Sequence, residues 1–276
     1  MIGAKNMWNR KEIKTKGKKK LKKNYLACVV VCFLLAFLGC EYSESATIIH
    51  GYNAETTVPE NVINQAERLT NMAIFDTDTN AITMAAEVAT STISYTFKLI
   101  GSVKDFILSN YTASFILALA FLVQIVYVFL ICNPLIVGSR KFFIENHSKK
   151  KAKIGLMLEP FKTKGYLNVV ITMFLQTLYL FLWIFTIVGF PIKLYEYRMI
   201  PFLLAEHPEL SRKEIFKLSK QMMYGNKWEM FKFDLSYIGW YLLDALTLGL
   251  TGIFYSNPYK AAATAEIYLK LKENTN

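Results

Sequence analysis

Ionisable residues inside apolar stretches are the places in this sequence where chemistry could occur. Lys193, Glu196 and Arg198 interrupt an apolar run that reaches Ala205, and Asp244 lies within WYLLDALTLG. A charge at membrane depth is costly and usually faces another charge or a watery cavity. Lys193 and Glu196 can pair on one helix face, whereas Arg198 needs a distortion or another partner. These four residues form a candidate intramembrane polar site, and an ion-paired, partly interfacial helix is the simpler interpretation.

One segment has the spacing of a calcium loop. DTDTNAITMAAE places Asp76, Asp78, Asn80 and Glu87 at positions 1, 3, 5 and 12 of such a loop. Position 6, however, is Ala81 where the turn requires glycine, and no second loop accompanies it. The pattern therefore favours a helix N-terminus rich in Asp and Asn, and we expect no calcium site.

Other catalytic or metal-binding patterns are missing from the sequence. No Gly-rich phosphate loop or nucleophile elbow occurs. No histidine has a Cys or an acid at metal-ligand spacing; the three are His50, His147 and His207. We therefore predict no catalytic residues, no metal and no cofactor. The cysteines lie in or beside apolar segments, where a thiol behaves as a small hydrophobe, and we expect no disulfide; they are Cys28, Cys32, Cys40 and Cys132.

Composition and charge indicate a membrane protein. The chain has 276 residues, 53% of them hydrophobic, and a formal charge of +11, an unusual pair of values for a soluble fold. Residues 1–23 carry ten Lys or Arg against one Glu, and residues 138–165 carry eight bases against two acids. Residues 41–110 carry nine acids against three bases. Because positive flanks stay in the cytoplasm, we expect the N-terminus inside and residues 41–110 outside.

The N-terminal basic run could also be a nucleic-acid arm, but it directly precedes the apolar stretch Tyr25–Cys40, which favours a membrane flank and no nucleic acid. That stretch has only 16 residues, so a cleaved signal, or a lipoprotein processed at Cys40, is a rival interpretation. We expect an uncleaved first membrane helix. Its flanking lysines can snorkel to extend it.

Further apolar stretches predict more membrane helices. Ala113–Ile131 is uncharged over 19 residues and ends at a bend around Pro134. Gly165–Ile192 is uncharged over 28 residues and should break near Gly189. Ser236–Leu250 should be another span, followed by a turn at Gly249 and Gly252 and a kink at Pro258. Residues 192–206 and 250–271 leave the number of crossings open, so we expect about four to six.

A surface helix should precede the last of these spans. Ser211 and Glu214 form a capping box that starts a helix running to about Tyr224. Its apolar residues, among them Ile215 and Met222, should rest on lipid, with lysines among anionic headgroups. The alternative is that this face packs on other protein helices and that the lysines are simply solvated. Aromatic residues should mark the headgroup level. The predicted membrane-interface residues are Lys213, Lys217, Lys220, Lys227, Trp228 and Trp240.

Long motifs in the second half resemble a known family. The carrying segments are NPLIVGSRKFF, LAEHPELSRKEIFKLS, and SK-x-M-M-x-G-x-K-W followed by L-S-x-I-G-W and N-P-Y. They resemble the bacterial integral membrane family labelled domain of unknown function 975, over most of residues 133–271 and more loosely over the Lys-rich start and the first helix. The resemblance implies a polytopic membrane protein without an assigned activity. It supplies no catalytic residues, and residues 41–110 lie outside its recognisable pattern.

The sequence as a whole predicts an all-α, polytopic transmembrane helical bundle with a cytoplasmic-side amphipathic helix. Its parts would be a basic cytoplasmic N-terminus (1–24), a first membrane helix (25–40), an extracytoplasmic insertion (41–110) and a membrane domain (111–276). We expect a non-enzymatic envelope scaffold or regulator, or a small-solute permease component, in the bacterial cell membrane. The alternative is a membrane-embedded enzyme or enzyme subunit acting on lipid. The expected partner is a bilayer with anionic headgroups, and a homo-oligomer or membrane partner stays open.

Overall fold

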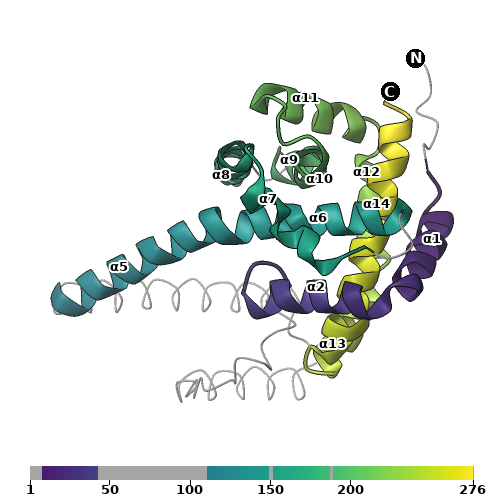
Figure 1. Ribbon diagram of the computed structural model, residues 1–276, viewed down its shortest axis with the longest axis horizontal. Coiled ribbons are helices and arrows are strands. Elements are labelled where there is room, and N and C mark those ends of the chain that lie inside the picture. The colour runs from purple at the N-terminus through teal and green to yellow at the C-terminus, as the bar shows by residue number, and fades with distance from the viewer. Residues whose placement is uncertain (1–7, 43–110, 149–151, 187–188, 276) are drawn as a thin grey trace, which may run out of the picture. The chain divides into compact units, whose positions relative to one another are not determined.

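The computed structural model describes residues 8–42, 111–148, 152–186 and 189–275, and every regular element in these ranges is helical (Figure 1). The predicted all-α fold is confirmed for this part of the chain. Residues 1–51 and 125–276 form one compact unit and residues 52–124 another. The calcium-like pattern at residues 76–87 and most of the predicted insertion lie outside the described residues.

Within each described range, the α-helices follow one another with short connections. They are α1 Arg10–Lys23, α2 Tyr25–Phe37, α5 Tyr111–Tyr127, α6 Asn133–Ser148, α7 Glu159–Lys162, α8 Tyr166–Trp183, α9 Gly189–Glu196, α10 Ile200–Glu206, α11 Arg212–Met223, α12 Lys227–Leu235, α13 Ile238–Leu246 and α14 Asn257–Glu273. A 3₁₀ turn, η3, covers Ile154–Leu158, and two π turns cover Val128–Cys132 (η2) and Gly252–Ser256 (η4).

The core of the larger unit is built around α14. Residues 261–268 of this helix are all buried, and α1 and α6 both pack against it (Figure 1). Gly17 allows α1 to come close, because a Cβ at this position would lie 2.7 Å from the Ala263 Cα. The final apolar segment, whose placement the sequence leaves open, is therefore a core helix.

Helices α2 and α6 lie antiparallel. At one end the Asn24 side-chain amide donates to the Asn146 amide oxygen at 3.2 Å. At the other end Cys40 and Cys132 form a disulfide, with their Cα atoms 4.8 Å apart. The expectation of no disulfide was wrong, because the fold brings together two residues 92 positions apart in the sequence. Cys28 and Cys32 are free and buried, as expected of small hydrophobes.

Neither Pro134 nor Pro258 interrupts the helix in which it lies. A continuous helix runs from Phe115 to Ser148 across Pro134, so the predicted bend there is wrong. Proline has no N–H to donate within a helix. A π turn precedes Pro134, and in it the Asn133 N–H bonds the Val128 carbonyl five residues earlier, as in a π-helix. The same arrangement recurs before Pro258, where Asn257 N–H bonds the Gly252 carbonyl and the helix again continues.

Within the residues that the structure describes, two helices are long and apolar enough to cross a membrane, Phe115–Ser148 and Tyr166–Trp183. The other predicted spans are shorter. The stretch after Gly165 divides into α8 and α9, with the break before Gly189 and not after it. The predicted span Ser236–Leu250 contains only the nine-residue α13, and nine residues extend about 14 Å, too short for a hydrocarbon core of about 30 Å.

Candidate functional site

A polar cavity of about 310 Å³ lies among the helices of the larger unit. Its walls come from the segment after α2 and from α6, α8, α9, α10, α13 and α14, together with the turn between α9 and α10. We call it the cationic cavity, and its lining residues are Glu41, Tyr42, Arg140, Gln176, Leu194, Arg198, Pro201, Phe202, Tyr241, Asn257, Lys260, Ala261 and Thr264.

Two carboxylates hold the three cations of this cavity in place. Arg198 makes a two-pronged contact with Asp234 on α12, at 2.6 and 2.9 Å. Lys260 on α14 approaches the same carboxylate at 3.1 Å and also bonds the Tyr241 hydroxyl. Burial opposes ionisation of Asp234, but the Arg198 and Lys260 charges outweigh it and lower its pKa below the ordinary value. The two cations are thus fixed at the wall by a shared counter-ion.

The third cation, Arg140 on α6, faces Glu41. Its guanidinium lies 2.5 Å from one Glu41 carboxylate oxygen and stacks over the Phe202 ring, 5.5 Å from the centroid. The other oxygen of Glu41 is buried and has no hydrogen-bond partner. Arg140 keeps only 12% of its side-chain surface exposed. The pair is therefore largely desolvated, which strengthens the attraction between the two charges.

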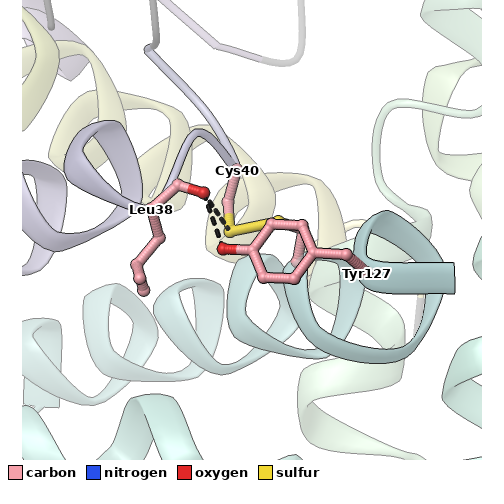
Figure 2. The surroundings of a disulfide bond; sticks show 4 residues. Leu38, Cys40 and Tyr127 are labelled. Atoms are coloured by element: carbon pink, nitrogen blue, oxygen red, sulfur yellow. Dashed lines mark hydrogen bonds between the residues drawn. A yellow bond between two sulfur atoms is a disulfide. The ribbon is translucent and has the colours of Figure 1, made fainter. Parts of the chain in front are cut away.

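Glu41 is placed by the disulfide that precedes it. Figure 2 shows the short segment after α2, where Cys40 is bonded to Cys132 and the Tyr127 hydroxyl donates to the Leu38 carbonyl at 2.8 Å. Gly39 and Tyr42 both have positive φ, at 66° and 62°, a conformation that costs energy for a tyrosine. The segment is thus held in one shape from several sides.

The predicted polar site is divided into three places. Lys193 bonds Glu196 at 2.6 Å, as the three-residue spacing predicts, and Lys227 reaches the same carboxylate at 2.5 Å. Arg198 finds its other partner in Asp234 and lines the cationic cavity. Its neighbour in sequence, Glu196, instead belongs to the cluster with Lys193 and Lys227, which we call the Glu196 cluster.

Asp244 shapes a turn. Its carboxylate accepts the Gly252 N–H at 2.5 Å, and its backbone carbonyl accepts the Gly249 N–H at 2.8 Å. Leu248 and Gly249 adopt positive φ, at 53° and 92°, as the chain reverses after α13. The glycine turn that the sequence predicts is present at this point. The described contacts of Asp244 therefore give it a local structural part in that reversal.

The capping box on α11 is present, with Ser211 and Glu214 each satisfying the other's backbone N–H. These hydrogen bonds from Ser211 lower the pKa of Glu214. The apolar face of α11, however, packs on protein: Ile215, Met222 and Met223 are buried. The expectation that this face rests on lipid is wrong, because neighbouring helices cover it.

The predicted membrane-interface residues divide by exposure. The lysines of α11, Lys213, Lys217 and Lys220, are exposed. Trp228 is exposed too and stacks on Phe231. Trp240 is half-buried against Tyr255, and Lys227 is occupied by Glu196. Four of the six are therefore exposed.

Sequence reasoning missed three charged residues that line the cavity, Glu41, Arg140 and Lys260. It also missed Asp234, which holds two of the cations from outside the lining. Each is a charge beside an apolar segment, and its partner comes from an element far away in the chain. One signal was available, since Arg140 and Lys260 both follow an Asn-Pro pair by a few residues, in NPLIVGSR and NPYK. Among the residues that the structure describes, no group of three His, Cys, Asp or Glu could hold a metal ion.

Comparison with known proteins gives one family. A search of curated proteins and a search of solved structures each returned no match. A family described as "Protein of unknown function (DUF975)" matches residues 7–275, a wider range than the motifs from Asn133 onward that carry the resemblance. The match covers nearly the whole chain, and the protein therefore belongs to the DUF975 family.

Proposed function

We propose that this protein is a multi-pass integral protein of the bacterial cell membrane, with its N-terminus in the cytoplasm. Exposed apolar surface supports the membrane location. Side chains along α5 and just after the end of α8 are large, apolar and uncovered, for example Phe121 at 68% and Phe185 at 77% exposure. Helix α13 has no buried residue, and Leu246 on it is 81% exposed. Lipid is the solvent that such surfaces require.

We further propose that it is non-enzymatic and acts as a component of a small-solute permease. The observation that carries this proposal is the cationic cavity, whose charges converge from separate helices on one space of about 310 Å³. Small-molecule sites are concave and carry a few convergent polar groups. An envelope scaffold, the other non-enzymatic possibility, has no need of such a space. The cavity therefore favours solute binding over scaffolding.

Accessibility of the cavity to solutes tests this proposal. Thr264 lines the cavity, whereas Thr172 is buried elsewhere at 0% exposure. A Thr264→Cys variant in proteoliposomes should react with a small methanethiosulfonate reagent, and a Thr172→Cys variant should not. The wild type supplies the background, since Cys28 and Cys32 are buried. If Thr264→Cys is as inert as Thr172→Cys, the cavity does not admit solutes and the proposal fails.

Action on lipid is the second candidate. It is favoured by exposed aromatic side chains near the Glu196 cluster: Tyr224 is 78% and Trp228 65% exposed, and Lys227 joins that cluster. Tyrosine and tryptophan are typical of the headgroup level. Mass spectrometry of lipids recovered after incubation with the purified protein distinguishes the two functions. New lipid products would favour an enzyme, and unchanged lipids together with a reactive Thr264→Cys would favour the permease component.

A further inference from the structure

The lining of the cationic cavity has an excess of positive charge. Arg140, Arg198 and Lys260 face Glu41, three positive side chains against one negative, a net charge of +2 for the lining residues. Asp234 lies outside the lining and offsets one of the two positive charges of Arg198 and Lys260 from α12, which leaves a net charge of +1 when it is counted with the lining. Because fields focus in a low-dielectric cleft, the space itself favours negative charge.

Uncharged groups beside these cations could bind the rest of a ligand. Gln176 contributes an amide whose oxygen is buried and has no hydrogen-bond partner. Thr264 and Tyr241 contribute hydroxyl groups to the same wall. A volume of about 310 Å³ is at the lower end of the range for ligand pockets, about 300–1,000 Å³, and so suits a small solute.

Glu41 already shows what kind of group fits. Its carboxylate enters from a short non-helical segment and meets the Arg140 guanidinium at 2.5 Å. One of its two oxygens remains without a partner, so Arg140 holds it through a single oxygen. A guanidinium can bind a carboxylate through both oxygens, and the observed contact does not use that capacity.

We propose that the cationic cavity binds a small solute bearing a carboxylate, and that Glu41 occupies the anion position beside Arg140 as an internal competitor. This inference rests on the proposed solute-binding function and names the class of ligand. The disulfide of Cys40 tethers the competitor, because it fixes the residue immediately before Glu41 to the end of η2. A ligand must displace Glu41 to reach Arg140, whereas Arg198 and Lys260 remain on Asp234.

The test measures succinate binding by calorimetry to the full-length protein in nanodiscs. Glu41→Gln removes the competing charge at nearly constant shape, and we expect it to tighten succinate binding at least tenfold, since a tethered group competes at about millimolar effective concentration. Glu12→Gln is the matched control, because Glu12 forms an exposed pair with Lys16 on α1 and lies outside the cavity. Unchanged or weaker binding by Glu41→Gln would overturn the proposal.

Two further ligands and one further variant complete the test. Neutral succinamide should not bind Glu41→Gln measurably, and equal binding of succinamide and succinate would contradict a carboxylate site. Inorganic phosphate should bind more weakly than succinate; tighter phosphate binding would replace the carboxylate with a phosphate ligand and overturn this assignment. Adding Lys260→Gln to Glu41→Gln should reverse at least part of the gain in affinity.

A second measurement covers the case in which Glu41→Gln does not fold. Dithiothreitol reduces the disulfide by giving it two electrons and two protons, so that Cys40 and Cys132 each carry a thiol and the reagent closes to its cyclic disulfide. The freed segment should release Glu41 and tighten succinate binding to the wild type. No change would overturn the proposal. If Thr264→Cys is reactive but succinate does not bind, the ligand class fails while the solute-binding function stands.

Discussion

Asp234 is the residue on which the wall of the cationic cavity depends. Its carboxylate joins α12 to Arg198 and to Lys260 of α14, and 20% of its side chain is exposed. Removing one partner of a buried ion pair leaves the other charge without compensation. Here the removal would leave two cations facing each other across a low-dielectric wall.

We predict that Asp234→Asn lowers the free energy of unfolding by about 2 kcal/mol at pH 7, less than a fully buried pair would lose. Because Arg198 and Lys260 lower the folded-state pKa of Asp234, its contribution is complete above the ordinary value of 3.8 and disappears as the pH falls through the lowered pKa. Thermal unfolding in detergent at pH 7 and pH 3 measures this. The difference between wild type and variant should shrink at the lower pH.

The control for this experiment is Glu273→Gln. This change removes an exposed ion pair with Lys270, and both residues of that pair lie on α14. Exposed pairs contribute little, so this variant should unfold like the wild type at both pH values. A pH-independent loss in Asp234→Asn would show that shape, and not charge, is what Asp234 contributes.

For individual residues, the sequence allowed only pairings between neighbours in the chain to be predicted. Lys193 and Glu196 pair as expected because three residues on a helix place them on one face. Glu41 and Arg140 are 99 positions apart, and no spacing rule connects them. Asp244 attracted interest as an acid in an apolar run, whereas its described contacts are with the turn that follows.

The close approach of η3 to α6 depends on Gly138. A Cβ at this position of α6 would overlap the backbone carbonyl of Met157 in η3, an atom that cannot move independently of the chain. The contact matters for the site, because Arg140 follows two residues later on α6. The fit of η3 against α6 therefore helps to position the cavity.

We predict that Gly138→Ala destabilises the fold by about 1–3 kcal/mol, the usual cost of overpacking. Gly155→Ala is the matched control, since a Cβ there meets nothing within 4 Å, and it should change stability by less than about 0.5 kcal/mol. Chemical or thermal unfolding of both variants gives the comparison. Equal stability of the two would mean that η3 is free to move away from α6.

Elements set by local chemistry were predictable, and elements set by packing were not. The capping box at Ser211 and Glu214 fixes the start of α11, and the structure has it as expected. The division of residues 227–246 into α12 and α13 carries no comparable signal. The sequence also did not decide that the α11 apolar face is buried by protein, because an amphipathic pattern does not say whether protein or lipid covers that face.

For the whole molecule, the exposed lysines of α11 predict a dependence on lipid charge. Each basic residue near an anionic surface contributes about 1 kcal/mol of attraction. The protein in nanodiscs should therefore be more stable to heat with anionic than with zwitterionic lipid. The triple variant Lys213→Gln, Lys217→Gln, Lys220→Gln should lose most of that difference, and the effect should weaken with salt.

The matched control replaces the same three lysines by arginine, which keeps the charge and should keep the lipid preference. If the glutamine variant retains the full difference between the two lipids, the lysine face is simply solvated and another surface meets the headgroups.

Orientation gives a further whole-molecule prediction. From the positive charge in residues 1–23 and 138–165 we predict that both segments lie in the cytoplasm and that residue 60 lies outside. A Glu60→Cys variant in a Cys-free background should react with an impermeant thiol reagent on intact cells. Labelling only after lysis would reverse the proposed topology.

The two π turns make the site depend on where a residue is lost as well as on which residue it is. A π turn contains one residue more than an α-helical turn, and each residue rotates a helix by about 100°. Deleting Leu130 from η2 would remove that extra residue and leave an ordinary α-helical turn, so that Cys132 and Arg140 keep their directions. Deleting Val137 from α6, where the helix holds no extra residue, would instead turn Arg140 by about 100° relative to Cys132. A one-residue change in length, which a surface loop tolerates, would there turn Arg140 away from the cavity while altering none of its charges.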